Sequence, residues 1–401
     1  MTPSDLALDD AFDQFDGSIA GDVRDPYPEL ADARRATPVQ RVTGAPGARP
    51  VFVVYRYDDV ARVLLDGELF SSSVLAEVMG PAMGEHIILG MDEPEHRRHR
   101  ALVATAFRHK ALARWETDLV RAVVDELIGA FRPRDRAELV RELTFRFPVQ
   151  VIAGVLGLPR ADYPQFQAWA SAIISVHAAW ERGMAASRAF KDYLAAVLEE
   201  RRAGPGDDLI SDLAVVELDG ERLSDEEIFS FLRLLLPAGA ETTFRSSGNL
   251  LYAMLTHTDQ LEAVRADRTL LPQAIEEALR WETPLLITTR VATRATELRG
   301  VPIPAGAEVT VVLGAANRDP ERYPDPDRFD IFRDPKQHIS FGHGPHMCLG
   351  MHLARMETRV AVDALLDALP DLRLDPAGDD PHIHGQVFRS PTSLPVLFRP
   401  A

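Results

Sequence analysis

A single cysteine stands in a loop whose composition suits metal binding. Residues 341–350 read Phe-Gly-His-Gly-Pro-His-Met-Cys-Leu-Gly, and the helix-forming segment Met-His-Leu-Ala-Arg-Met-Glu follows at once. A cysteine at a helix N-terminus faces unpaired backbone N–H groups and the positive end of the helix dipole, which favour the thiolate, the form that binds iron. Glycines let a flat ring approach the backbone closely. The loop therefore predicts Cys348 as a metal ligand, and the alternative is a buried, unreactive cysteine.

A carboxylate and a hydroxyl lie side by side within a long apolar stretch. Ser-Asp-Glu-Glu at 224–227 has the pattern of a capping box, so we expect a helix to begin there and to run to about residue 256. Pro237 predicts a local distortion near Ala238–Thr242. Glu241 and Thr242 could then relay protons while bulk water is kept out. The alternatives are a solvated glutamate and a threonine hydroxyl that bonds back to a helix carbonyl.

Charged residues recur at helical spacing in two other segments. His96 and Arg100 stand four residues apart and share one helix face, whereas Glu277 and Arg280, three apart, form a pair that is common on protein surfaces. From His96 to residue 114 the chain carries basic residues and no acidic one, although its formal net charge is -17. This basic stripe favours an acidic partner, and the alternative is a solvated helix face. The stripe comprises Arg97, Arg98, Arg100, Arg108, Lys110 and Arg114.

The elements that must position these residues are mainly helical. Apolar residues recur at three- and four-residue steps in segments near 97–113, 116–131, 145–156, 165–178, 184–202 and 225–256, and further helices are expected over 58–65 and about 350–368. Strand-like runs occur at 51–55 and 308–313. We expect a mainly α fold with small β-sheets, in which a helical body over about 94–282 lies between β-containing regions at about 1–70 and 285–401. Without a Gly/Ser-rich linker, the prediction is one domain over 1–401.

Composition excludes several classes of function. One cysteine among 401 residues rules out an internal disulfide and a cysteine-rich zinc site. The net charge of -17 argues against general nucleic-acid binding. No run of about 18 uninterrupted apolar residues is present and the N-terminus is acidic, so we expect a cytoplasmic protein without a membrane anchor.

The cysteine loop resembles the ligand loop of the cytochrome P450 family. That loop reads Phe-Gly-x-Gly-x-His-x-Cys-x-Gly, and every specified position matches. Ala-Gly-Ala-Glu-Thr-Thr at 238–243 is similar to the family's Ala-Gly-x-Glu/Asp-Thr segment on the distal face of the haem, although Pro237 departs from the family pattern. The resemblance implies the cytochrome P450 fold, with haem b (iron protoporphyrin IX) between a long kinked central helix and the cysteine loop. Cys348 is then the axial ligand to the iron.

The resemblance also implies roles for residues around the haem. Phe341 shields the sulfur, and His346 reaches a propionate. A Glu-x-x-Arg pair and a Pro-x-Arg-Phe segment supply a structural triad that supports the loop, which maps to Glu277, Arg280 and Arg328. The haem-binding residues implied in this way are His96, Arg100, Ala238, Gly239, Arg290, Phe341, Gly342, His346 and Gly350.

The implied activity is that of a monooxygenase. One oxygen atom of O2 is inserted into a hydrophobic small molecule, by hydroxylation or epoxidation, with Glu241 and Thr242 assisting protonation. Electrons come from NAD(P)H through an acidic ferredoxin or flavodoxin-like protein that docks on the basic stripe. The alternatives are a peroxide-driven peroxygenase, whose relatives carry an Arg-Pro pair in place of the acid and alcohol, a haem-thiolate protein that binds ligand without turnover, and a haem-free interaction protein.

The substrate-facing segments of the family map to mostly apolar or small residues of this chain, for which ordinary core packing is the alternative. They include Val78, Met79, Met83, Ile87, Ile88, Leu285, Leu286, Ile287, Val387 and Phe388.

Overall fold

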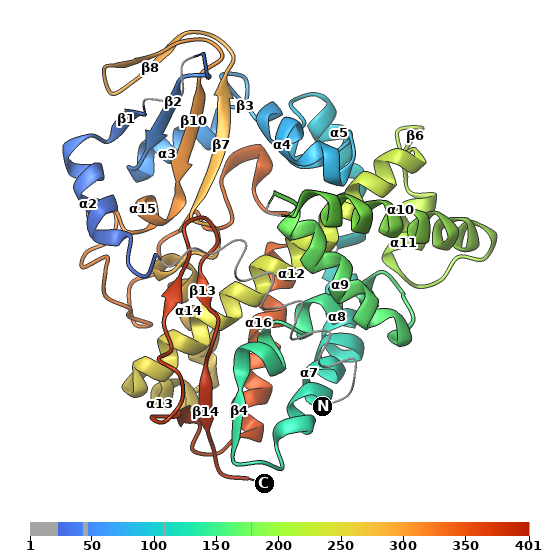
Figure 1. The fold of residues 1–401 in the computed structure, drawn as a ribbon, viewed down its shortest axis with the longest axis vertical. Helices are drawn as coiled ribbons and strands as arrows, with labels where there is room; N and C mark the ends of the chain where they lie inside the picture. The colour runs from blue at the N-terminus through green and yellow to red at the C-terminus, as the bar shows by residue number, and fades with distance from the viewer. Residues whose placement is uncertain (1–22, 43–46, 108, 178, 401) are drawn as a thin grey trace.

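Helices build most of the protein (Figure 1). The computed structural model describes residues 23–42, 47–107, 109–177 and 179–400. The α-helices are α2 (Tyr27–Ala36), α3 (Tyr57–Leu65), α4 (Ser73–Met83), α5 (Glu95–Ala104), α6 (His109–Trp115), α7 (Arg121–Phe131), α8 (Phe147–Val155), α9 (Tyr163–Ile174), α10 (Trp180–Ala203), α11 (Leu209–Val215), α12 (Asp225–Thr256), α13 (Thr258–Ala266), α14 (Leu271–Trp281), α15 (Leu313–Asn317) and α16 (Met351–Ala368). Short 3-10 or π segments join several of them.

The strands are short and form small sheets beside the helical body (Figure 1), which confirms the predicted mainly α class. They are β1 (Val39–Val42), β2 (Val51–Val54), β3 (Phe70–Ser71), β4 (Arg136–Glu138), β5 (Glu217–Leu218), β6 (Glu221–Arg222), β7 (Ile287–Ala292), β8 (Thr296–Leu298), β9 (Val301–Ile303), β10 (Glu308–Val312), β11 (Arg373–Leu374), β12 (Ile383–His384), β13 (Ser390–Pro391) and β14 (Pro395–Leu397).

The largest sheet joins residues 39–71 to residues 287–312. Its strand order is β1-β2-β10-β7-β3, and β10 runs parallel to β2, with Glu308 opposite Val51. Alternate residues such as Phe52, Val54 and Val309 pack into a core with α3. In the pairing of β10 with β7, Arg290 lies opposite Val309, and the side chain of Arg290 is buried.

The helix α12 is the central element of the helical body. Its N-terminus has the predicted capping box, in which the Ser224 hydroxyl accepts the Glu227 N–H and the Glu227 carboxylate accepts the Ser224 N–H at 2.6 Å. Side chains are buried around most of its circumference, because α8, α9, α14 and α16 pack against it. The helix continues without interruption through Pro237, so the distortion predicted from this residue does not break it.

Sequence periodicity located most of the long helices but not α4. Its sequence, Ser-Val-Leu-Ala-Glu-Val-Met-Gly-Pro-Ala-Met, contains Pro81 and small residues, which weaken the apolar pattern. No helix in the described parts of the chain is long and apolar enough to cross a membrane.

Candidate active site

The cysteine loop is held by backbone contacts from several directions. The Cys348 N–H donates to the Phe341 carbonyl at 2.8 Å, and α16 begins three residues later. Gly344 has a φ of +72°, and a Cβ there would lie 2.7 Å from the Leu64 carbonyl oxygen of α3. Gly342 also has a positive φ, of +74°, whereas Gly350 does not. The first two glycines therefore shape the loop, as the sequence suggested.

Many protein atoms surround the Cys348 thiol, but the residue is still exposed on one side. Burial raises its pKa above the usual value, because enclosure outweighs the Gly350 N–H and the positive charges of Arg100 and Arg355. Part of the side chain remains exposed, so it faces a space that solvent can enter. Within the same loop, the Phe341 ring lies against the guanidinium of Arg355, which is 4.5 Å from the ring centroid.

Four basic side chains gather beside this loop. The rings of His96 and His346 lie close together, with their centroids 3.9 Å apart and their planes tilted by 34°. Arg100 donates to the Met347 carbonyl at 2.6 Å, and Arg290 donates only to the carbonyl of its neighbour. Burial lowers the pKa of His346 to about 3, helped by the positive charges of His96, Arg290 and Arg100. The pKa of Arg290 is lowered to about 10 by burial.

These basic side chains fit an anionic ligand. The Nε2 atom of His96 is buried and has no hydrogen-bond partner, and neither Arg100 nor Arg290 lies within 4.0 Å of a carboxylate among the described residues. Buried cations without counterions are costly, so carboxylates of a bound group would compensate them. No set of three or more His, Cys, Asp or Glu residues in the described ranges could hold a metal. A metal at Cys348 therefore needs its other ligands from a bound macrocycle, and haem has both features.

The face of α12 near Pro237 opens toward solvent-accessible space. Ala238 is exposed, and Gly239 and Thr242 are half-buried, although Ala240 and Glu241 between them are buried. The Thr242 hydroxyl donates to the Ala238 carbonyl at 2.8 Å, which is the backward bond considered from the sequence. A Cβ on Gly239 would lie 2.8 Å from Ile152, so this glycine serves the packing of α12 against α8.

The acid of the acid–alcohol pair is buried, not solvated. Glu241 accepts a hydrogen bond from the Nε of Arg245 at 2.5 Å, one helical turn later, and the Arg245 Nη1 donates to the Ser390 hydroxyl at 2.9 Å. The guanidinium also lies over the Phe388 ring, 5.5 Å from its centroid. Arg245 was not predicted, because a lysine or arginine four residues after a glutamate is ordinary on exposed helices.

The structure corrects one member of the predicted triad. Arg280 pairs with Glu277 at 2.7 Å and donates to the carbonyl oxygens of Pro326 and Arg328. The side chain of Arg328, however, is 67% exposed and lies near Asp330. The third member is Arg333, whose Nε is 3.4 Å from the Glu277 carboxylate. A turn at residues 325–328 directs Arg328 outward, so only its backbone contributes.

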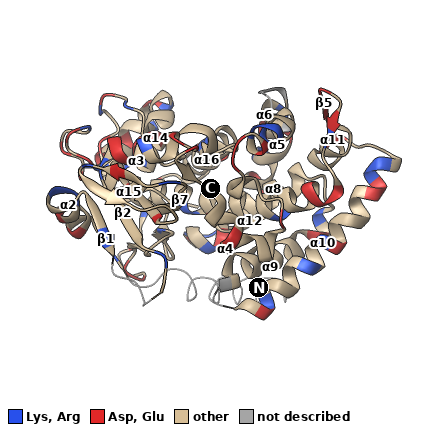
Figure 2. Cartoon of the chain, turned by 90° about the horizontal axis from the view of Figure 1, so that it is seen from above, with Lys and Arg blue, Asp and Glu red and all other residues tan. Residues whose placement is uncertain are grey.

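The basic stripe is less positive than its sequence suggested. Arg97 pairs with Glu93 at 3.1 Å, Arg98 with Glu227 at 2.6 Å, and Arg114 with Asp207. Figure 2 shows basic and acidic segments close together near α5. A nearby acid thus compensates Arg97, and acids distant in sequence compensate Arg98 and Arg114. Arg108 lies outside the described residues, as does the side chain of Lys110.

The predicted substrate-facing residues are divided between core and accessible positions. Met83 and Ile87 are buried in the main core, and Leu286 is buried against Tyr55, so these three residues do not line an accessible space. Val78 is exposed on α4. Residues that remain partly accessible are Met79, Ile88, Leu285, Ile287, Val387 and Phe388, and Leu285 pairs with Phe388 across a β-bridge.

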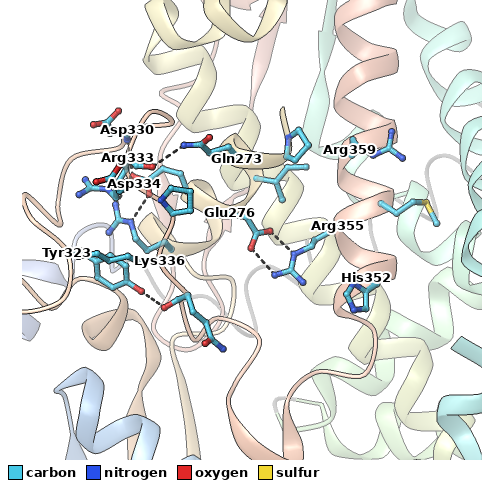
Figure 3. Close-up of a pocket in the computed structure, with 17 residues that line it drawn as sticks. Gln273, Glu276, Tyr323, Asp330, Arg333, Asp334, Lys336, His352, Arg355 and Arg359 are labelled. Carbon is cyan, nitrogen blue, oxygen red and sulfur yellow. Dashed lines mark hydrogen bonds and ion pairs between the residues drawn. The ribbon is translucent and has the colours of Figure 1, made fainter. Parts of the chain in front are cut away.

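A cleft of about 630 Å³ lies beside α16 and contains none of these residues. Its wall is charged: Arg355 of α16 reaches Glu276 of α14 through two hydrogen bonds, as Figure 3 shows. Although burial opposes it, the hydrogen bonds from Arg355 and His338 hold the pKa of Glu276 at about 2.

Comparisons with known proteins agree on one family. The family model described as Cytochrome P450 matches residues 165–394. The chain is 39% identical to cytochrome P450 monooxygenase PikC of Streptomyces venezuelae, over 94% of this chain and 91% of that protein. It is 36% identical to a vitamin D(3) 25-hydroxylase of Pseudonocardia autotrophica, over 94% of each. The crystal structure of CYP109E1 from Bacillus megaterium in complex with testosterone superposes with a TM-score of 0.86 at 32% identity, covering 94% of this chain and 99% of that one.

Proposed function

This chain belongs to the cytochrome P450 family, and from that premise we propose that it oxidises an apolar small molecule with Cys348 as the thiolate ligand of haem b. It has the cytochrome P450 fold and is a cytochrome P450 monooxygenase. The proposal concerns the residues, the substrate and the electron donor. We further propose that the whole chain serves this one site as a single domain, since both its β-containing and helical regions contribute residues.

The basic cluster beside Cys348 carries this proposal. His96 and Arg100 come from α5, Arg290 from β7 and His346 from the cysteine loop, and Arg100 and Arg290 are cations without an acidic partner among the described residues. Two carboxylates on the edge of one flat group would account for them. The same group would place its metal at the exposed Cys348 thiol.

Haem in this position supplies the activation of O2, with electron density from the thiolate favouring O–O cleavage. The chain supplies the surroundings. The Thr242 hydroxyl can exchange its bond to the Ala238 carbonyl for a bond to water or to a reacting oxygen, and so deliver a proton. Glu241, held by Arg245, is the nearest buried acid on α12 from which that proton can be replaced. The helices packed around α12 limit the access of bulk water.

An apolar substrate is supported by relatives whose names identify hydrophobic molecules, such as vitamin D(3) and testosterone. The partly accessible residues Leu285, Ile287 and Phe388 are candidates for its contacts. Electrons from NAD(P)H would come through an acidic ferredoxin or flavodoxin-like protein at the α5 surface. Because the side chain of Arg97 is 81% exposed, whereas those of Arg98 and Arg114 are 37% and 33% exposed, we expect this docking to depend mainly on Arg97.

The test compares purified wild type with Cys348→Ala. Wild type should contain stoichiometric haem and show the carbon monoxide difference band of a reduced haem thiolate, and the variant should lose that band. With a surrogate ferredoxin system, NAD(P)H consumption should yield a product containing one oxygen atom from O2. A large advantage of peroxide over reductase-driven turnover would instead identify a peroxygenase, and haem binding without product would identify a binding protein.

A further inference from the structure

Buried arginines in this protein differ in whether a carboxylate accompanies them. Five have a carboxylate oxygen within 4.0 Å, namely Arg34, Arg245, Arg280, Arg318 and Arg389. Among the buried arginines of the described residues, Arg290 and Arg233 have none. Arg290 belongs to the basic cluster beside Cys348, where the haem carboxylates are its proposed partner. Arg233 has no such explanation.

Arg233 lies between three helices and makes only weak contacts there. Arg233 is buried, with only 7% of its surface exposed. The Nε donates to the Phe229 carbonyl at 3.3 Å and the Nη1 to the Ser187 hydroxyl of α10 at 3.4 Å. Ser187 in turn donates to the Ala82 carbonyl in the last turn of α4. The Ser230 hydroxyl is also buried and has no hydrogen-bond partner.

The Ser230 hydroxyl and the Arg233 guanidinium both lie beside the residue that follows α4. Gly84, which has a φ of +104°, leaves a position without a side chain, and a Cβ there would lie 2.3 Å from the Ser230 hydroxyl and 2.4 Å from the Arg233 Nη2. Burial lowers the pKa of Arg233, which reflects the cost of holding a cation here. Glu226, the acid that opposes this shift, is bound to Lys191 at 2.7 Å, so its charge is already compensated.

We infer that Arg233, with the Ser230 and Ser187 hydroxyls, binds a carboxylate group on the substrate. The inference rests on the proposed function, because its ligand is the molecule to be oxidised. One guanidinium with two hydroxyls matches the single negative charge of a carboxylate better than the two charges of a phosphate monoester.

The position of Arg233 also indicates which part of the substrate is oxidised. Thr242 stands nine residues further along α12, which corresponds to about 13 Å of helix. The substrate would therefore be an apolar molecule with one carboxylate, and oxidation would occur far from that group. Helix α4, which ends beside Arg233, carries Met79, one of the predicted substrate-facing residues that remain partly accessible.

The experiment uses the haem-loaded protein and matched probes that differ in charge. Octanoate, dodecanoate and hexadecanoate are titrated beside the alcohols of equal length, and binding is followed by the spin-state change of the iron and by the shift in unfolding temperature. Wild type should bind the best acid at least about tenfold more tightly than its alcohol, as expected for a charge-assisted hydrogen bond in a buried site. Arg233→Gln should reduce this preference to less than about threefold, and Arg233→Lys should retain part of it.

Arg121→Gln is the control, because it removes a partly exposed arginine of α7 and leaves Arg233 and both hydroxyls of the proposed site in place. It should retain most of the preference for the acid. Equal binding of acids and alcohols by wild type, no binding of any acid, or an undiminished preference in Arg233→Gln would overturn the inference. So would equal weakening of both probe types in the Gln and Lys variants, which would indicate a structural role. If Arg233→Gln does not fold, Arg233→Lys and Ser230→Ala supply the comparison.

Failure of the proposed function would look different. It would abolish the carbon monoxide band or the oxidised product in wild type, whereas the shift in unfolding temperature would still compare acids with alcohols. Conversely, a wild type that has the band and oxidises neutral apolar molecules, but shows no preference for acids, would retain the proposed function and refute the role of Arg233.

Discussion

The buried pair of Glu241 and Arg245 should contribute far more to stability than its spacing suggests. The two residues are 4% and 1% exposed, and the Arg245 Nε lies 2.5 Å from the carboxylate. Arg245→Gln would remove the cation and leave the carboxylate enclosed between α12 and the segment that carries Ser390. Breaking a buried pair in this way costs about 3–5 kcal/mol, because an uncompensated charge remains in the interior.

The expected change in unfolding temperature follows from the size of the protein. Unfolding entropy of about 2.1 cal/mol/K per residue gives about 0.8 kcal/mol/K for 401 residues. A loss of about 3–5 kcal/mol therefore corresponds to a decrease of about 4 to 6 °C in Tm. Combining Arg245→Gln with Glu241→Gln should recover part of that loss, because the double variant buries no unpaired charge.

A pair with the same spacing and a different environment is the control. Arg121 and Asp125 are also four residues apart on one helix, at 2.9 Å, but their side chains are 46% and 52% exposed. Arg121→Gln should change the free energy of unfolding by less than about 0.5 kcal/mol. Thermal unfolding followed by circular dichroism compares these variants. If Arg245→Gln lowers Tm no more than Arg121→Gln does, burial does not make this ion pair important.

Three other substitutions address separate features. Arg333→Gln should lower Tm and speed haem loss, because it removes a cation from the buried Glu277, whereas Arg328→Gln should leave both measurements within error of wild type. Burial raises the pKa of Glu357 well above its usual 4.5, so the folded state keeps a proton that the unfolded state releases. The stability that protonated Glu357 contributes is present below pH 4.5 and is lost as pH rises toward the raised pKa. Glu357→Gln should therefore reduce the decline of the unfolding free energy with rising pH. An unchanged slope would contradict the raised pKa of Glu357. Ser224→Ala removes the capping hydroxyl of α12 and should cost about 1 kcal/mol in urea unfolding, with Ser224→Asp retaining most of the stability.

Features encoded by local pattern were predictable from the sequence. The capping box located the first turn of α12, and apolar periodicity located α10 and α16, because these signals depend only on neighbouring residues. The cysteine loop belongs to the same class, since the positive φ angles at Gly342 and Gly344 require those residues locally. The family, fold and general reaction followed from such motifs.

Features set by tertiary packing were not predictable. Arg333 replaces Arg328 beside Glu277 because of how a turn directs each side chain, and neighbouring sequence does not distinguish the two. Arg245 and Arg233 look like ordinary surface charges in the sequence, and only the packing of α4, α10 and β13 around α12 buries them. The acidic partners of Arg98 and Arg114 likewise come from residues distant along the chain.

The parallel pairing of β2 with β10 has a consequence for the order of events during synthesis. As the ribosome releases the chain, β2 emerges early and can pair with β1, but it cannot pair with β10 until residues 308–312 have emerged. His96 and Arg100 on α5 also precede His346 and Cys348 by most of the polypeptide. Nascent chains would thus gain haem affinity only when translation is nearly finished, and truncated products that stop before α16 would not sequester the cofactor.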